Sequence, residues 1–384
     1  MTLGTKSNPI PIHRSGLLDL RRCPRYYFYR YLSSPSGTFS LSTPSLGLDS
    51  ALSNPDLVIG SAIHKALEVA LLGQSTQSEM EAAAFPILTE AAQKGWSMCN
   101  LGFEEEATAH YRQILRGMIW LCRRQILPYI SSRYQVIETE KEMDPLILQH
   151  PTSSLYYAFQ SRIDGVLREL GSNHPVLLSW KSCATYTSEL SRNVEFDDQG
   201  LSESLAFYHS TGEWPSVLMP YIAKGRKERG ITPFKTFSGI WSTLYTRGLE
   251  TTPSYRKGWD KTSVAAHFGP GDLDYWDSLL LQDPTLFDDY WATPPVTTRS
   301  PHQAEEWLHW AIEDFDRWYS RAISTPTLHP ESFAPYPSGT LSYKRVCTYH
   351  DTCKGLIPLS SLVEQGRFVP RDPHHPSSLE GWDD

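Results

Sequence analysis

Long apolar runs are missing from this chain of 384 residues, and none of its hydrophobic segments reaches the length that crosses a bilayer. The first residues, MTLGTKSNPIPIHR, lack the basic and then apolar pattern of a secretory signal. The six cysteines are too few and too scattered for a disulfide-based scaffold. We therefore expect an intracellular protein, in the cytoplasm of a cell or encoded by a virus, with no membrane partner.

Three common catalytic motifs are also absent. The sequence contains no glycine-rich phosphate-binding loop, no G-x-S-x-G turn and no dinucleotide-binding fingerprint. The enzyme classes that depend on those motifs are therefore not expected. What remains is a composition with 40% hydrophobic and 12% aromatic residues, which is typical of a globular chain that folds as one large domain or two ordinary ones.

The net charge of −8 gives no sign of a nucleic-acid partner, but DNA contacts depend on local fields rather than on the total charge. Basic residues form two local clusters. A cluster of this size is more often an ordinary solvated surface, so charge alone does not assign DNA binding to either. The first cluster is Arg21, Arg22, Arg25 and Arg30, and the second is Lys224, Arg226, Lys227 and Arg229.

Helical periodicity dominates the first third of the sequence. Apolar residues recur at helical spacing, and Pro24 is expected to interrupt or restart the first helix. Residues 34–54 are rich in Ser, Thr, Pro and Gly and predict an irregular insertion. The expected helices are Ser15–Leu32, Asp56–Leu72, Ser78–Lys94 and Glu104–Ile130.

The pattern changes to strands after residue 133. Glu203–Ser210 predicts a short helix, residues 237–291 are rich in Trp and Tyr and predict loop and helix, and Ser300–Ser324 predicts an amphipathic helix. The expected strands are Tyr134–Glu142, Tyr156–Leu170, Val176–Ser182 and Val217–Ala223.

Helices on either side of a small mixed sheet predict an α/β (α+β) fold with helical additions at both ends. Four parts of the chain are expected. Residues 1–55 form an N-terminal helix and an irregular insertion, residues 56–230 form the core, residues 231–365 form a helical and aromatic part that packs on the N-terminal helix, and residues 366–384 form a polar tail.

The stretch SRIDGVLRELGSNHPVLLSWKSC, from Ser161 to Cys183, predicts a β-hairpin around a Gly-Ser-Asn-His-Pro connection. Asp164 lies on the first strand and Lys181 ends the second, and strand pairing brings opposed side chains together. An Asp on one strand and an acid-x-Lys sequence on the next is the pattern with which metal-dependent nucleases hold a cation and polarise the attacking water. Position 179, where this pattern has the acid, is a serine.

These segments resemble the PD-(D/E)XK nuclease superfamily, in its RecB-type branch, over most of the chain. GSAIHKALE resembles the branch's helix with a metal-binding histidine, here His64. SRIDGVL resembles the strand that carries the metal-binding aspartate, Asp164, and LLSWKS resembles the strand with the catalytic lysine, Lys181. The resemblance also implies a restriction-endonuclease-like core, a Mg²⁺ or Mn²⁺ cofactor, and a carbonyl of Trp180 that faces this metal.

The two ends of the chain resemble the iron–sulfur members of that branch, which include helicase–nuclease subunits, CRISPR adaptation nucleases and phage exonucleases. RRCPRYYFYRYL resembles their N-terminal motif and places Cys23 as a cluster ligand. FAPYPSGTLSYKRVCTYHDTCKG resembles their C-terminal motif, with Cys347 and Cys353 in its last two positions. The resemblance implies a [4Fe–4S] cluster that ties the first helix to the last segment and so closes a very long loop.

The chain departs from the family pattern at three positions. Ser179 replaces the acid before the catalytic lysine, which removes a hard anionic ligand from a site whose cation prefers carboxylate oxygens. Ser204 stands where the family's Q-x-x-x-Y helix would begin; Tyr208 matches the end of that motif and is expected to be catalytic, whereas Gln199 lies five residues too early. Lys344 replaces the first C-terminal cysteine, so a four-iron cluster would need another ligand.

The resemblance implies a metal-dependent, exonuclease-like DNA nuclease of recombination, repair or phage DNA metabolism. In an active enzyme another acid would take the place of residue 179. Glu138, Glu140 and Glu142 are candidates because alternate residues of a strand share a face, and Glu140 is the expected metal ligand. The expected DNA-binding residues are Arg21, Arg25, Lys224, Arg226 and Lys227.

Two alternatives explain Ser179 differently. In the first, the chain is a degenerate nuclease that keeps the fold for DNA binding or as a scaffold, which the joint departures at Ser179, Ser204 and Lys344 favour. In the second, Ser179 is an engineered replacement meant to trap substrate. Besides DNA, the expected partners are a helicase, an annealing protein or a virion component.

Overall fold

The computed structural model describes the chain in segments separated by gaps. The predictions at Arg226, Lys227 and Lys344 lie outside these described residues, as does most of the expected loop and helix between 237 and 291. The described residues are 3–42, 47–51, 53–73, 75–95, 104–183, 197–224, 273–282, 284–285, 291–325, 327–333, 340–341 and 345–371.

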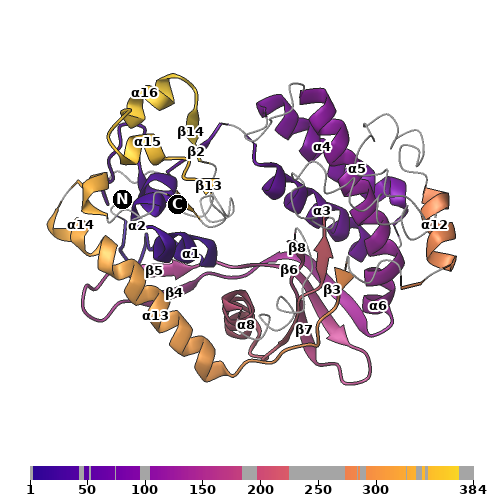
Figure 1. The fold of residues 1–384 in the computed structure, drawn as a ribbon. Helices are drawn as coiled ribbons and strands as arrows, with labels where there is room; N and C mark the ends of the chain where they lie inside the picture. Colours follow the sequence, from indigo (N-terminus) through magenta and orange to yellow (C-terminus); the bar gives the residue numbers. More distant parts are fainter. Residues whose placement is uncertain are drawn as a thin grey trace.

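A four-stranded sheet in the order β3-β6-β7-β9 forms the centre of the molecule (Figure 1). β3 pairs with β6 and β6 with β7 in antiparallel fashion, whereas β7 and β9 are parallel. The hairpin expected around Asp164 and the mixed sheet are therefore confirmed. The strands are β3 (Tyr134–Glu142), β6 (Arg162–Glu169), β7 (Pro175–Leu178) and β9 (Ser216–Leu218).

Two of the expected strands are each split by a short break. β7 stops before Ser179 and the chain resumes as β8 (Lys181–Cys183), and β9 is followed in the same way by β10 (Tyr221–Ala223). Pairing continues across the breaks, since the backbone N–H of Ser179 donates to the carbonyl of Leu218 at 3.0 Å and β8 and β10 are parallel neighbours. The break places Ser179 and Trp180 between two strands. β11 (Trp291–Ala292) pairs with β10.

One face of the sheet is covered by α3, behind which α4 and α5 pack (Figure 1). Leu167, Val176, Leu178 and Leu218 point to this side and share an apolar core with the helices. The helical predictions for this region are confirmed. The elements are α3 (Pro55–Leu72), α4 (Gln77–Lys94), α5 (Glu104–Leu121), a π-helical turn (Cys122–Ile126) and α6 (Leu127–Ser131).

The opposite face is covered by α8, which is backed by α13 and α1 (Figure 1). Val166, Leu177 and Val217 point to this side, because successive residues of a strand face opposite sides of a sheet. α8 is longer than expected, and the amphipathic helix expected at 300–324 is α13 followed by α14. The bounds are α1 (Arg14–Arg22), α8 (Asp198–Thr211), α13 (Pro301–Tyr319) and α14 (Arg321–Ser324).

The first expected helix is broken at Cys23, next to Pro24, as the sequence indicated. Cys23 ends α1 and caps α2 (Pro24–Tyr27), which continues as a π-helical turn (Phe28–Leu32). The two ends of the chain meet here (Figure 1), because β2 (Leu48–Ser50) pairs with β14 (Phe368–Pro370). The sequence predicted neither strand, since one lies in the expected insertion and the other in the expected polar tail.

The remaining elements are short and lie around this region or at the edge of the helical layer. β1 and β4 flank β5 in a second small sheet. Together these elements complete a mixed α/β fold with helical additions at both ends, as expected. Their bounds are β1 (Ile10–Ile12), β4 (Leu146–Gln149), β5 (Tyr156–Phe159), α12 (Leu273–Gln282), a 3-10 turn (Pro330–Ser332), β12 (Thr340–Leu341), β13 (Arg345–Val346), α15 (His350–Cys353) and α16 (Leu359–Glu364).

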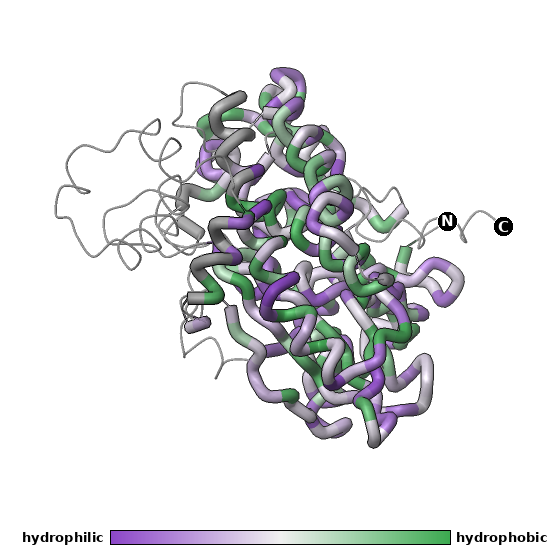
Figure 2. Tube along the Cα trace, turned by 90° about the vertical axis from the view of Figure 1, so that its right-hand side faces the viewer, coloured by the Kyte–Doolittle hydropathy of each residue, from purple (hydrophilic) through white to green (hydrophobic). Residues whose placement is uncertain are grey.

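Hydrophobic residues occur in short stretches along the chain, interrupted by hydrophilic ones (Figure 2). Within the described residues, no helix combines the length and the apolar character that crossing a membrane requires.

Candidate active site

Three acid or imidazole side chains from three elements meet at one end of the central sheet. His64 comes from α3, Glu140 from β3 and Asp164 from β6, and one ligand atom of each lies within 4.8 Å of the others. Nδ1 of His64 is 3.5 Å from Oδ1 of Asp164. Two carboxylates and an imidazole suit Mg²⁺ or Mn²⁺, and among the described residues this is the cluster whose donors fit a divalent cation. Three of the four residues expected from the sequence as metal ligands, all except Trp180, are thus brought together.

The pairing of β3 with β6 puts Glu140 opposite Asp164. Thr139 pairs with Gly165 and Lys141 with Ile163, after a register shift between Val136 and Glu138. The backbone of Glu140 has φ 47°, in the left-handed region that residues other than glycine rarely adopt. A residue held there costs about 1–3 kcal/mol, and such strain is typically found at functional sites. The strained residue here carries one of the three candidate ligands.

The two carboxylates of the cluster differ in acidity. Burial would raise the pKa of Asp164, but the hydrogen bond and charge of His64, the charge of Lys181 and the backbone N–H of Trp180 together lower it below 3.8. That N–H donates to Oδ2 of Asp164 at 2.7 Å. Burial and the nearby charge of Asp164 raise the pKa of Glu140. Of the two carboxylates, Asp164 is therefore the one that stays ionised more readily.

Lys181 lies beside this cluster and its ammonium group is fixed by three acceptors. Nζ donates to Oε1 of Gln199 at 2.6 Å, to the hydroxyl of Ser179 at 2.9 Å and to the carbonyl of Trp180 at 3.3 Å. The expected role of the Trp180 carbonyl as a metal ligand stays a prediction, and here that carbonyl accepts from the lysine. Gln199, five residues too early for the family motif, is the glutamine that reaches the lysine.

A carboxyl that the sequence analysis missed completes this group. Glu203 on α8 is 2% exposed, and its Oε1 accepts from Nε2 of Gln199 at 2.5 Å and from the hydroxyl of Ser179 at 3.4 Å. Oε2 is buried and has no hydrogen-bond partner within the described part of the chain. Burial raises the pKa of Glu203 to about 8. An acid is therefore present next to Ser179, supplied by a helix rather than by the strand.

One sequence signal could have found Glu203. It lies four residues after Gln199, so the two side chains share a face of the same helix. The sequence predicted a replacement acid on β3 alone, because this strand was expected to lie next to the strand that carries Asp164. Glu138 on that strand pairs instead with Lys141 at 2.7 Å.

Tyr208, expected to be catalytic, lies more than one turn beyond Glu203 on α8. Its side chain is 37% exposed and its ring packs against Trp214, with centroids 5.4 Å apart. The hydroxyl of Ser204, in contrast, is buried. The catalytic role of Tyr208 stays a prediction.

The expected DNA-binding residues are engaged in different ways. Arg21 pairs with Asp314 at 2.6 Å. Arg25 donates through Nε to the carbonyls of Pro330 and Phe333 at 3.1 and 3.0 Å, which ties α2 to the C-terminal part of the chain. Lys224 follows β10. DNA binding by these residues stays a prediction, and for Arg25 it would compete with the carbonyl contacts.

Cys23, Cys347 and Cys353 come together from the two ends of the chain. Burial, together with the nearby charges of Cys23 and Cys353, raises the pKa of Cys347 to about 11. Arg25 donates to the sulfur of Cys353 at 3.6 Å, and the sulfur of Cys23 accepts from the backbone N–H of Tyr26 at 3.4 Å. The juxtaposition that the two cysteine motifs implied is therefore present.

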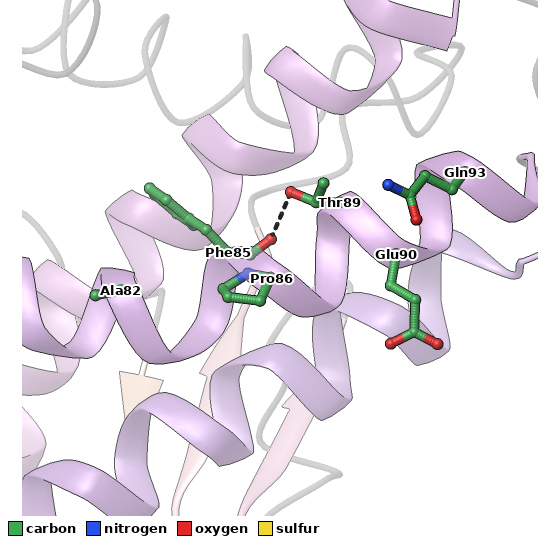
Figure 3. Close-up of a pocket in the computed structure, with 6 residues that line it drawn as sticks. All are labelled: Ala82, Phe85, Pro86, Thr89, Glu90 and Gln93. Carbon is green, nitrogen blue, oxygen red and sulfur yellow. Dashed lines mark hydrogen bonds between the residues drawn. The ribbon is translucent and has the colours of Figure 1, made fainter.

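A pocket on the surface of α4 is separate from these groups (Figure 3). Glu90, the one ionisable residue of its lining, pairs with Lys94 at 2.8 Å. The pocket thus offers little acid–base chemistry, and the candidate site is the polar cluster on the sheet. The pocket is lined by Ala82, Phe85, Pro86, Thr89, Glu90 and Gln93.

Comparison with known proteins agrees with this geometry. The family model described as the PD-(D/E)XK nuclease superfamily matches residues 14–209, slightly more than half of the chain. The matched range includes His64, Glu140, Asp164, Lys181 and Glu203. No curated protein matches the sequence.

Proposed function

Because the chain belongs to the PD-(D/E)XK nuclease superfamily, whose members use divalent metals, we propose that it is a metal-dependent DNA nuclease in which Glu203 supplies the acid missing at position 179. His64, Glu140 and Asp164 would hold Mg²⁺ or Mn²⁺, and the metal would polarise the phosphate and the attacking water. Lys181, beside Asp164, would stabilise the charge that develops on the phosphate.

The observation that carries this proposal is the contact set of Glu203. Lys181 and Glu203 both contact Ser179 and Gln199, so the lysine has a carboxyl partner nearby although residue 179 is a serine. The unpartnered buried Oε2 supports the same reading, because a buried carboxyl oxygen without a donor is costly unless a cation or a proton completes it. In a site without catalytic function, no chemistry would require Glu203 and Lys181 to share these contacts.

We extend this proposal to the branch of the superfamily, the type of reaction and the partners. The GSAIHKALE helix and the cysteine motifs favour the RecB-type branch and an exonuclease-like role in recombination, repair or phage DNA metabolism, with a helicase, annealing protein or virion component as partner. A degenerate nuclease fold that only binds DNA or serves as a scaffold is the second candidate, favoured by Ser204 and Lys344.

The two candidates differ in a metal-dependent assay. We expect the wild-type protein to degrade linear DNA with Mn²⁺ or Mg²⁺ and cleavage to stop when a chelator is added, because two carboxylates and an imidazole would hold the cation on which the reaction depends. Calorimetric titration with Mn²⁺ on the same sample measures the binding directly. Neither binding nor cleavage with any divalent metal would identify a degenerate site, and salt-sensitive DNA binding would then define the remaining role.

We also propose that Cys23, Cys347 and Cys353 hold an iron–sulfur cluster. The donor set fits in kind, since three cysteines from both ends of the chain gather beside Arg25, which donates to the sulfur of Cys353 at 3.6 Å. Such a cluster would link α2 to the C-terminal segment.

Iron and acid-labile sulfide should therefore be present in protein purified without oxygen, together with visible absorption, and Cys353→Ser should lower all three. Cys122→Ser is the matched control, because Cys122 is buried within the helical core. Wild-type protein that contains no iron, and whose thermal stability equals that of Cys353→Ser, would show that the cysteines are only packed side chains.

A further inference from the structure

Arg14 connects the N-terminal helix to the candidate active site. It lies in the first turn of α1, and its guanidinium donates through Nη2 to Oδ1 of Asp197 at 2.9 Å and through Nη1 to Oε1 of Gln199 at 3.3 Å. Asp197 is in turn the N-cap of α8, since its Oδ1 accepts from the backbone N–H of Gln199 at 2.7 Å. One arginine therefore holds both the start of α8 and the side chain that reaches Lys181.

The amide of Gln199 makes use of both its ends. Its oxygen accepts from two cations, Lys181 at 2.6 Å and Arg14 at 3.3 Å, and its nitrogen donates to Ser179 at 2.8 Å and to Glu203 at 2.5 Å. An amide turned by 180° would present N–H groups to two cations and its oxygen to a carboxyl. Arg14 thus favours the one orientation in which the glutamine can bridge Lys181 and Glu203.

We propose that Arg14 is a positioning residue for the reaction: it fixes the orientation of Gln199 and, through it, the place of the Lys181 ammonium group beside Glu203. This inference rests on the proposed nuclease function and adds a residue outside the catalytic motifs. Half-buried geometry supports it, because the side chains of Arg14 and Asp197 are 26% and 23% exposed, so their contact is partly shielded from water.

A second arginine of α1, Arg21, also contacts the start of α8. Two turns beyond Arg14, Arg21 pairs with Asp314 of α13 at 2.6 Å and approaches Asp198 of α8 at 3.7 Å. The same face of α1 therefore contacts the start of α8 twice. Only Arg14 reaches the glutamine, so its effect on Lys181 is separable from general docking of the helix.

Arg14→Gln removes both contacts while keeping a polar side chain of similar length. We expect kcat for DNA cleavage to fall about 10–100-fold, as a small misplacement of a catalytic group does, with KM for DNA nearly unchanged. Arg14→Lys should recover part of the loss. Arg116→Gln is the matched control: it removes a half-buried pair with Glu81, 3.1 Å apart, between α5 and α4, and kcat should stay at the wild-type value.

A double-mutant cycle tests the route of the effect. In a Gln199→Ala background, Arg14→Gln should cause no further fall in kcat, because the glutamine is the only link between the arginine and the lysine that the proposal uses. Independent, multiplicative losses would overturn the proposal, as would a loss in Arg14→Gln that appears in KM alone.

A second readout does not depend on cleavage. The rate at which an amine-specific reagent labels Lys181, followed by mass spectrometry, should rise severalfold in Arg14→Gln and stay constant in Arg116→Gln. Unchanged labelling of Lys181 overturns the positioning role. If Lys181 is labelled faster in Arg14→Gln but the wild-type protein cleaves no DNA, the nuclease function is wrong while the positioning contact is supported.

Discussion

Asp164→Asn is expected to reduce Mn²⁺-dependent cleavage of linear DNA by about 10³-fold or more, which corresponds to the several kcal/mol that a metal contributes to such a transition state. The change keeps the size of the side chain and an oxygen for the N–H of Trp180, 2.7 Å away, so the fold should persist. It removes the carboxylate whose lowered pKa keeps it ionised beside His64. Calorimetric Mn²⁺ titration should show much weaker binding in the same sample.

Asp144→Asn provides the control, because it makes the same chemical change at an exposed position after β3. It should leave both Mn²⁺ affinity and cleavage unchanged. Cleavage by Asp164→Asn at the wild-type rate would mean that the cluster of His64, Glu140 and Asp164 is not where the reaction takes place.

The second large effect concerns Glu203. Glu203→Gln is expected to lower kcat about 10²–10³-fold, because it removes the carboxyl that is linked through Ser179 and Gln199 to Lys181, the group proposed to stabilise the developing charge. The exchanged pair Ser179→Asp with Glu203→Ser should recover part of the activity, since it returns a carboxylate to the same place from the strand. Steady-state cleavage assays of the three proteins measure this. An inactive single variant with no recovery in the exchanged pair would limit Glu203 to a structural role, and a fully active single variant would exclude it from the reaction.

Thermal unfolding of the metal-free protein gives an independent check on Glu203. Burial raises its pKa from 4.5 to about 8, so the native state holds this proton more tightly than the unfolded state. The stability that this proton provides is complete below about pH 4.5 and is lost as the pH rises through 8. Glu203→Gln should remove this contribution, and its melting temperature should fall less between pH 5 and pH 9 than that of the wild type.

The sequence predicted most residues of the candidate site, but not the hydrogen bonds that link them through Gln199 and Glu203. His64, Asp164 and Lys181 each lie in a short segment with a pattern that the sequence analysis recognised. β6 pairs with β7 as expected, and the chain after β7 contacts Asp164 through the N–H of Trp180, just before Lys181. Glu140 required the parity of a strand as well. Glu203 was missed because its contact with Ser179 joins a helix to a strand: the four-residue spacing from Gln199 places the two side chains on one helix face, but does not show that this face meets the sheet.

The fold shows the same division. The helices α3, α4 and α13 were predictable because their apolar periodicity is local. The breaks between β7 and β8 and between β9 and β10 were not, because both strands are buried and read as continuous apolar runs. β2 and β14 are three residues each and form strands by pairing with each other, so neither segment alone indicates a strand.

The pairing of β2 with β14 also has a consequence for how the protein is made. Ser50 lies opposite Phe368, so some three hundred residues are synthesised after β2 before its partner exists. At typical rates of synthesis this takes roughly 15–60 s, during which β2 has an unpaired edge. α1 likewise lacks its partner until α13 is synthesised, because Arg21 of α1 pairs with Asp314 of α13. A growing chain therefore gains the helix that binds α1 only late in synthesis. A ribosome-bound chain that stops before α13 should carry the motif residues of the candidate site without the helix to which Arg21 of α1 binds.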